Sequence, residues 1–471
     1  MSETPVDPTP EIRIDPIGRR KQARARAARR VLSPILRFGH LEASGGIVLL
    51  LAAVAAMIWA NSPAKESYFA FFQQEFVFGI GDWSLLYKGK PLTLELAIND
   101  LLMAIFFLVV GLEIKREVLM GELSTFRMAA LPAMAAIGGM VVPALCFVAF
   151  NAGGPGANGW AIPMATDIAF SLGILAMLGS KAPTALKVFL TALAIVDDLG
   201  AVLVIAIFYT AKLDFGALGM AGLFLVGLIG LNFFGVRKLL PYMILGLGLW
   251  YGFLQSGVHA TIAGVVLAMT IPVWVRFDGK EFARRTRESL AVLEQRVTEN
   301  GPVLLTDAGQ SAIEDMEHLS EGAQMPLRRV IHILHPWLTF FIVPIFAFAN
   351  AGVTVTPEIH RVISDPIVMG VVLGLFVGKP LGIVFFVWLA VKLKLGQLAR
   401  RVTWSHMLGV GFLAGIGFTM SLFIANLAFI GNPSQIESAK EGILLGSLFS
   451  GVAGYLLLSR GSRTRHRATE A

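Results

Sequence analysis

The sequence has a single cysteine, Cys146, and few charged residues for its length: Asp, Glu, Lys and Arg make up 15% of its 471 residues. One cysteine excludes a framework of intrachain disulfide bonds. A soluble domain carries about 25% charged residues, so a row of soluble domains is excluded as well. The chain also lacks the P-loop pattern that cradles nucleotide phosphates, which argues against an ATPase.

Long apolar runs take the place of the missing charge. Hydrophobic residues make up 55% of the chain, and its mean hydropathy is +0.70. The runs have about the length that a helix needs to cross 30 Å of hydrocarbon. The basic N-terminal stretch resembles a signal peptide, but the next run is long and lacks a clear cleavage pattern, so we expect a retained first span. About twelve transmembrane helices are predicted, near residues 44–61, 96–114, 127–150, 161–179, 184–209, 215–235, 239–254, 257–275, 336–353, 366–391, 405–429 and 438–459.

Basic residues are distributed unevenly between the two sides of this predicted layout. With the N-terminus in the cytoplasm, 32 of the 39 Lys and Arg residues fall on the cytoplasmic side, six fall on the other side, and Lys379 lies inside a span. This bias predicts an even number of spans with both termini in the cytoplasm. It also accounts for the net charge of +7 without a nucleic-acid partner.

The predicted membrane domain covers residues 37–461 and is flanked by polar segments. Residues 1–36 are expected to form a disordered basic tail that contacts anionic lipid, and residues 462–471 a cytoplasmic tail. Residues 62–95 are predicted to be an external loop with a short β-hairpin, because two apolar stretches flank a Gly-Asp pair. Residues 278–327 are predicted to be a cytoplasmic insertion. An amphipathic helix is expected over 281–297, and no clear period follows it.

Two adjacent carboxylates, Asp197 and Asp198, lie in the middle of the apolar run TALAIVDDLGAVLVIAIF. Each ionised Asp at the centre of a helix adds about 2.5–3.5 kcal/mol to the free energy of inserting that helix into a membrane. Residues of this kind are therefore usually functional. Neighbours on a helix point about 100° apart, so one carboxylate can face a central cavity while the other faces a partner helix. The alternative is that both cap a short helix, but apolar residues continue on both sides.

A lone cation, Lys379, lies deep in another span, in LGLFVGKPLGIVFF. Burial disfavours its ammonium form and a nearby carboxylate favours it. Its natural partner is one of the two aspartates. Lys379 could carry a proton or only brace the structure as a buried ion pair, and the two roles are compatible.

Two spans are interrupted by helix-breaking residues. Pro163 precedes Thr166 and Asp167, which can cap the backbone groups that such a break leaves unpaired. Gly411, Gly415 and Gly417 interrupt a late span in the same way. Two such spans in different halves indicate a midplane site built from broken helices, although Asp167 could instead be a structural cap.

Together these residues predict a site at which protons and a hard cation compete. A buried carboxylate can hold a proton at cellular pH. Once ionised, its oxygens suit Na⁺ or Li⁺ better than a soft metal. Competition for the same oxygens is sufficient for exchange, and no cofactor is needed.

Seven motifs occur in order along the chain: LVVGLEIKREVLMGEL, IPMATDIAFSLGIL, ALAIVDDLGAV, GVHATIAGV, LHPWLTFFIVPIFAFANAGV, FVGKPLGI and GIGFTMSLF. With these motifs the chain resembles the NhaA-type sodium/proton antiporters over about residues 41–460. The resemblance implies an all-α membrane fold with inverted repeats and two broken, crossing helices. It implies a multi-pass protein of the bacterial inner membrane that is not an enzyme and exchanges internal Na⁺ or Li⁺ for external protons, two protons for each Na⁺. Asp197 and Asp198 would hold the cation and protons, Lys379 would exchange a proton with Asp197, and Thr166 and Asp167 would lie at the crossing.

The same resemblance implies a pH-sensing cluster and a dimer. The family commonly has a glutamate directly before His332, where this chain has Ile331, so the pH threshold is expected to differ. Each cluster member could instead belong to an ordinary solvated helix end. The external hairpin is implied as the contact of a homodimer. The residues implied in pH sensing are Glu113, Arg116, Glu117, Arg328, Arg329, His332, His335 and His259.

Two other classes of function are compatible with buried carboxylates. A proton-coupled transporter of an organic solute would need polar or aromatic residues around a larger cavity, and few lie inside the spans. A membrane enzyme would need a nucleophile and base, or a metal set, at depth. The nearest ligand pair, His332 and His335, is predicted to lie at a basic interface.

Overall fold

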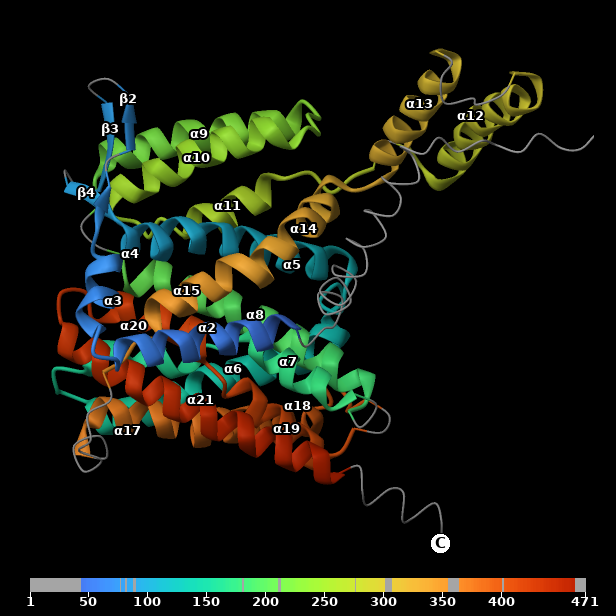
Figure 1. Ribbon diagram of the computed structural model, residues 1–471. Helices are drawn as coiled ribbons and strands as arrows, with labels where there is room; N and C mark the ends of the chain where they lie inside the picture. Colours follow the sequence, from blue (N-terminus) through green and yellow to red (C-terminus); the bar gives the residue numbers. More distant parts are fainter. Residues whose placement is uncertain are drawn as a thin grey trace, which may run out of the picture.

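The computed structural model describes residues 44–76, 78–80, 83–87, 90–179, 182–210, 213–275, 277–300, 307–354, 364–399 and 402–461. The predicted tails, 1–36 and 462–471, lie outside the described residues. Most of the described chain forms helices that run side by side in one bundle (Figure 1). Large apolar side chains on the outside, such as Phe233 and Leu223, are 84% and 71% exposed, as expected where a protein surface meets lipid.

Six of the helices follow predicted spans without interruption. Their apolar residues extend around most of the helix, because one side meets other helices and the other meets lipid. They are α2 (Ser44–Ala60), α6 (Phe126–Asn151), α8 (Thr184–Phe208), α9 (Phe215–Phe233), α10 (Leu239–Ser256) and α21 (Pro433–Gly461).

Five further spans contain a change of helix type or a break. Two are broken: η2 (Ala157–Met164) is followed by α7 (Ile168–Met177), and α19 (Trp404–Ala414) is followed by α20 (Phe418–Ala428). The other three contain a π-helical turn, which is common at functional sites. These are α4 (Leu94–Ala97), η1 (Ile98–Leu102) and α5 (Met103–Met120); α14 (Pro326–Trp337), η5 (Leu338–Ile342) and α15 (Val343–Asn350); and α17 (Pro366–Leu373), η6 (Gly374–Gly378) and α18 (Lys379–Lys392).

The structure supports a multi-span membrane protein, and the number of spans stays a prediction. Eight of the described helices are long and apolar enough to cross a membrane, or up to ten if two bent helix pairs count as one span each. The predicted span 257–275 is helical only over α11 (Ile262–Thr270). The predicted span 336–353 is part of a helix that begins earlier, at Pro326, because a proline at the first helical position needs no hydrogen-bond donor.

The segment 278–327 forms two helices rather than one. The expected amphipathic helix is confirmed as α12 (Gly279–Asn300). After it, where the sequence shows no clear period, a second helix, α13 (Asp307–Ala323), follows and packs against α12. Buried Ala312 and Leu319 on α13 show that one face is apolar. That face is short and interrupted by polar residues, which obscures its period in the sequence.

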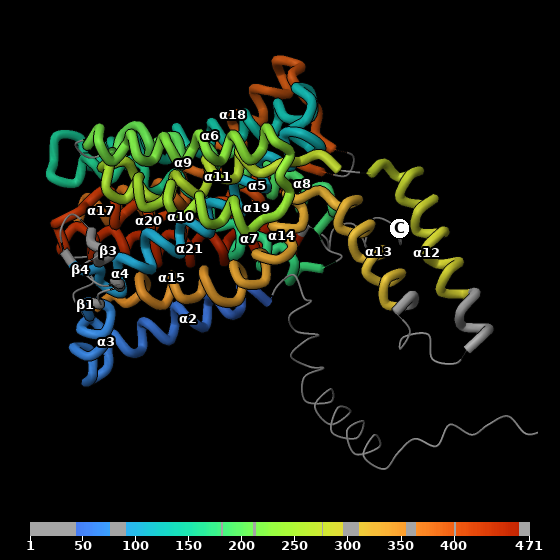
Figure 2. The backbone as a smooth tube through the Cα atoms, turned by 90° about the horizontal axis from the view of Figure 1, so that it is seen from above, coloured from blue at the N-terminus to red at the C-terminus, as the bar shows by residue number. Residues whose placement is uncertain are grey.

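The segment after α2 contains a short helix, α3 (Lys65–Phe72), and four strands. The strands are β1 (Glu75–Phe76), β2 (Phe78–Ile80), β3 (Trp83–Tyr87) and β4 (Lys90–Thr93), in the order β1-β4-β3-β2. The antiparallel pair β2 and β3 is the segment in which the sequence predicts a hairpin, with Ile80 opposite Trp83. The strands lie at one end of the helix bundle, and α12 and α13 extend from the other end (Figures 1 and 2).

Close packing of α18 against α6 places the buried lysine. At Gly382, a Cβ atom would lie 2.1 Å from the Gly138 carbonyl oxygen, so only glycine allows this approach. One turn earlier, Gly378 faces Pro143, where a Cβ would lie 2.9 Å from the proline Cα. The backbone that carries Lys379 is therefore held directly against α6, between the two broken spans.

Candidate functional site

Asp197 and Asp198 are buried in the middle of α8, with 1% of each residue exposed. One Asp197 oxygen, Oδ2, accepts hydrogen bonds from Lys379 Nζ at 2.8 Å and from Thr166 Oγ1 at 2.6 Å. Lys379 is fully buried and also donates to the carbonyl of Met164. The structure therefore brings together three of the residues predicted for the site: Asp197, Lys379 and Thr166.

The remaining carboxylate oxygens of the pair have no such partner. Asp197 Oδ1 and both oxygens of Asp198 are buried and accept no hydrogen bond from the residues that the structure describes. The charged groups that act on Asp198 are those of Asp197, Lys379, Asp167 and Glu113. A buried ionised carboxylate without donors is costly, so these oxygens require a proton or a cation.

Asp167 lies at the point where the two broken spans cross. Its backbone N–H donates to the Ile416 carbonyl at 2.7 Å, which joins the two breaks directly. Its Oδ1 accepts from Phe170 N at 3.0 Å, and its Oδ2 accepts from Thr419 N at 3.1 Å and Thr419 Oγ1 at 2.5 Å. One carboxylate therefore caps both α7 and α20, and its negative charge faces the positive ends of two helix dipoles.

Thr166 can respond to the protonation state of Asp197. Its hydroxyl lies 2.6 Å from Asp197 Oδ2 and 2.9 Å from the Ala414 carbonyl. A hydroxyl has one proton to donate, so it serves one of these acceptors at a time. With Asp197 ionised, the proton points to the carboxylate. With Asp197 protonated, the hydroxyl can accept from it and donate to Ala414.

Two participants in these contacts were not identified from the sequence. Thr419 follows Gly417 by two residues in GIGFTMSLF, so a polar residue at the start of a half-helix was the available signal. The Met164 carbonyl is a backbone group, and only its position after Pro163 indicated that it would lack a helical partner.

The residues implied in pH sensing divide into two places. On α5, Arg116 pairs with Glu117 at 2.8 Å, and Glu117 also accepts from the backbone N–H of Glu122. Arg116 and His332 are the charged groups that act on His335 of α14, so the α5 and α14 members lie together. Arg328, Arg329, His332 and His335 have exposed side chains, whereas Ile331 is only 7% exposed and belongs to an apolar cluster.

His259 is separate from both the carboxylates and the α14 cluster. Its Nδ1 lies 3.1 Å from Thr261 Oγ1, and its ring meets Phe423 edge-on with centroids 5.6 Å apart. Within the described part of the chain, no hydrogen bond joins it to Asp167, Asp197 or Asp198. The residue lies between α10 and α11, against α20.

Comparison with known proteins identifies the family. The family model described as "Na+/H+ antiporter 1" matches residues 36–458. The chain belongs to this family. The chain is 49% identical to the Na⁺/H⁺ antiporter NhaA of Oleidesulfovibrio alaskensis over 429 residues, which cover 91% of this chain and 94% of that protein. This antiporter-family chain is also 49% identical to the NhaA proteins of Wolinella succinogenes, over 90% and 92% of the two chains, and Helicobacter pylori, over 88% and 93%.

Membership confirms the resemblance to NhaA-type antiporters and, with the helical structure, an all-α membrane fold of that family, whereas the inverted repeats and the number of spans stay predictions. The antiporter shows no group of three or more His, Cys, Asp or Glu side chains positioned to hold a resident metal ion among the residues described.

Proposed function

We propose that this protein exchanges Na⁺ or Li⁺ from the cell interior for external protons at Asp197 and Asp198. The observation that carries the proposal is the set of three buried carboxylate oxygens that accept no hydrogen bond from the described residues, next to a buried ammonium. Oxygen ligands of this kind suit a hard monovalent cation. The same oxygens bind protons, so the two substrates exclude one another.

The contacts suggest how the exchange proceeds. In the proton-loaded state, Asp198 holds a proton and Lys379 holds another while it pairs with Asp197. When Na⁺ enters, Asp198 loses its proton, and both its oxygens and Asp197 Oδ1 become ligands. Lys379 then releases its proton to the cytoplasm and lets go of Asp197, and its amine keeps the Met164 carbonyl as its partner, so two protons leave for each Na⁺ that binds. Asp167 holds the crossing in place throughout, because all its contacts go to the two half-helices.

The exchange is electrogenic if two protons enter for each Na⁺ that leaves. One net positive charge then moves inward, which yields about 2.3 kcal/mol per 100 mV of inside-negative potential. This energy would drive Na⁺ out against its gradient. The protein would therefore serve sodium and pH homeostasis, with activity that rises as the cytoplasm becomes alkaline and the α5 and α14 cluster loses protons.

The bundle end that bears α12 and α13 would face the cytoplasm of a bacterial inner membrane. The C-terminal end of α21 lies at that same bundle end (Figure 1), and basic residues concentrate there. The strands at the opposite end would then be external, where a second copy of the chain would pair with them to form a homodimer.

Transport in everted membrane vesicles tests this function. With an imposed proton gradient, added Na⁺ or Li⁺ should dissipate the gradient, because each cation that enters the vesicle displaces protons. Sugars and amino acids should have no effect. Dissipation by an organic solute but not by Na⁺ would instead favour a proton-coupled solute transporter.

A further inference from the structure

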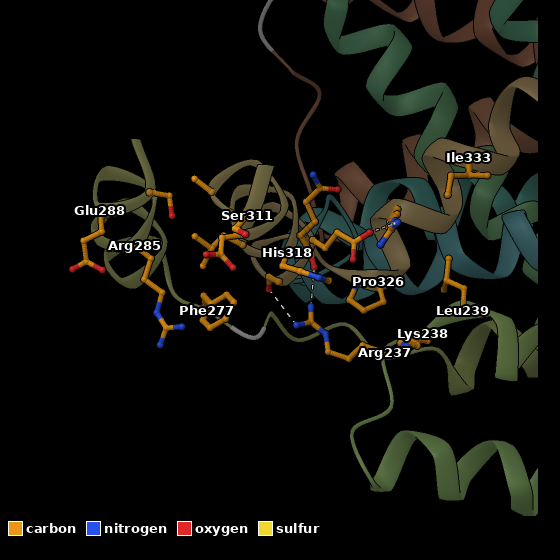
Figure 3. Close-up of a pocket in the computed structure, with 18 of the residues that line it drawn as sticks. Arg237, Lys238, Leu239, Phe277, Arg285, Glu288, Ser311, His318, Pro326 and Ile333 are labelled. Carbon is orange, nitrogen blue, oxygen red and sulfur yellow. Dashed lines mark hydrogen bonds and ion pairs between the residues drawn. The ribbon is translucent and has the colours of Figure 1, made fainter. Parts of the chain in front are cut away.

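The α12–α13 hairpin is fastened to the membrane domain at one corner. Arg237, in the connection between α9 and α10, donates from Nη1 to the Gly322 carbonyl at 3.2 Å and from Nη2 to the Gln324 carbonyl at 2.9 Å (Figure 3). These carbonyls are at the end of α13, where a cation is favoured by the helix dipole. Phe277 packs against Gly322, where a Cβ would lie 2.4 Å from the ring. The corner is therefore held from two sides.

The same corner contacts α14, the helix that carries the predicted pH-sensing histidines. Glu321 Oε1 of α13 lies 2.6 Å from Arg329 Nη2 of α14. Only Gln324 and Met325 separate the two helices in the chain. Movement of α14 therefore strains a contact that the hairpin corner holds in place.

Helix α14 has no acidic residue of its own. Its sequence, PLRRVIHILHPW, contains four basic or titratable side chains. Position 331, where the family commonly has an acid, is a buried isoleucine packed among Leu327 and Val330. On α5, Glu117 is already paired with Arg116. The acid that pairs with α14 in the described structure therefore comes from α13.

The other charged side chains near the Glu321–Arg329 ion pair either pair with neighbours on their own helix or line the cavity beside it. On α12, hydrogen bonds from Arg285 and Arg284 hold the pKa of half-buried Glu281 below its usual range, so these arginines are engaged within their own helix. Beside these contacts, a cavity of about 1150 Å³ lies between the hairpin, α14 and the α9–α10 connection. The charged and titratable groups of the other elements that line it are Arg285 and Glu288 of α12, Asp315, His318 and Glu321 of α13, and Arg237 and Lys238. On α5, Arg116 acts on His335 and is near Glu113 and Glu117.

We propose that the α12–α13 hairpin is a regulatory arm, in which Glu321 supplies to Arg329 the acidic partner that Ile331 cannot provide. The arm thereby sets the pH at which α14 responds. This inference rests on the proposed function, because its primary readout is the pH profile of exchange. The arm belongs to the segment 278–327, for which the sequence alone indicates no function.

The test compares Glu321→Gln with Glu317→Gln in vesicles across a range of pH. Glu317 is one turn earlier on the same helix, is exposed, and has no ion pair in the described structure. Removing the charge of Glu321 makes neighbouring protons easier to lose. We expect the pH of half-maximal exchange to fall by about half a unit, the scale of an exposed ion pair, with the maximal rate unchanged. Glu317→Gln should leave the pH profile of exchange unchanged. The double variant Glu321→Arg with Arg329→Glu, which reverses the ion pair, should have the wild-type profile.

A second readout does not depend on transport. Hydrogen exchange of peptide 326–337, followed against pH in purified protein, should show the same shift in Glu321→Gln alone. The proposed role of the arm would be contradicted if Glu321→Gln shifted neither the pH profile of exchange nor the hydrogen exchange of 326–337. Equal shifts in Glu321→Gln and Glu317→Gln would contradict it as well. If wild-type vesicles show no Na⁺-dependent exchange at all, the proposed function is wrong, and the hydrogen-exchange comparison still decides the role of Glu321.

Discussion

Replacing Asp198 with asparagine is expected to abolish Na⁺/H⁺ exchange while the protein still reaches the membrane. The substitution keeps the shape of the side chain and removes the charge from two buried oxygens that no described residue contacts. Loss of a charged partner in a buried site costs about 3–5 kcal/mol, which corresponds to more than a 100-fold loss of cation affinity. Dissipation of the proton gradient by Na⁺ in everted vesicles measures the effect.

The stability of Asp198→Asn separates a functional role from a structural one. A buried ionised carboxylate without donors destabilises the fold, so its neutral replacement should leave the melting temperature unchanged or raise it. Glu314→Gln is the control for loss of an exposed carboxylate, because Glu314 is exposed on α13 and does not line the cavity beside α14. Na⁺/H⁺ exchange that persists in Asp198→Asn would show that Asp198 is not part of the exchange site.

Replacing Lys379 with alanine is expected to weaken the dependence of Na⁺ binding on pH. In the wild type, Na⁺ displaces one proton from Asp198 and takes Asp197 from the Lys379 ammonium, 2.8 Å away, which then loses the second proton. In the alanine variant the proton that Lys379 releases is absent, and Thr166 remains as the donor to Asp197. The slope of log Kd against pH should fall from about two toward about one. Titration of Na⁺ into purified wild type and variant at several pH values gives this slope.

The same variant decides whether Lys379 carries a proton or only braces the fold. A brace alone would lower thermal stability and leave the slope as in the wild type. Lys392→Ala is the control from the same helix, because Lys392 lies over the exposed Trp388 ring at 4.8 Å and is far along α18 from the carboxylates. If the slope of log Kd against pH were the same in Lys379→Ala as in the wild type, Lys379 would have only a structural role.

The polar residues of the site were predictable from the sequence because charge inside an apolar run is costly. Asp197, Asp198 and Lys379 each interrupt a run that would otherwise favour insertion, and the structure confirms that two of them pair. Helix positions followed from the same runs. The breaks near residues 165 and 416 followed from Pro163 and Gly417, although the hydrogen bond that joins them could not be predicted, because it links backbone groups far apart in the chain.

Contacts between separate segments account for what the sequence did not reveal. The double cap of Asp167 depends on Thr419, about 250 residues later, and no local pattern indicates that the two meet. The pairing of Glu321 with Arg329 depends on a tight connection between two helices, one of which has no clear period in the sequence. Ile331 illustrates the reverse case: its departure from the family pattern was visible at once, but the acid that replaces the missing partner was not.

The dependence of Na⁺ affinity on pH tests the central claim most directly. Calorimetric titration of Na⁺ into the purified wild-type protein should show affinity that rises about a hundredfold for each unit of increasing pH, as expected for two displaced protons, until the site no longer holds them. That result means that protons and Na⁺ occupy the same oxygens. An affinity that stays constant across the range would show that they bind independently, and the proposed exchange at Asp197 and Asp198 would be contradicted.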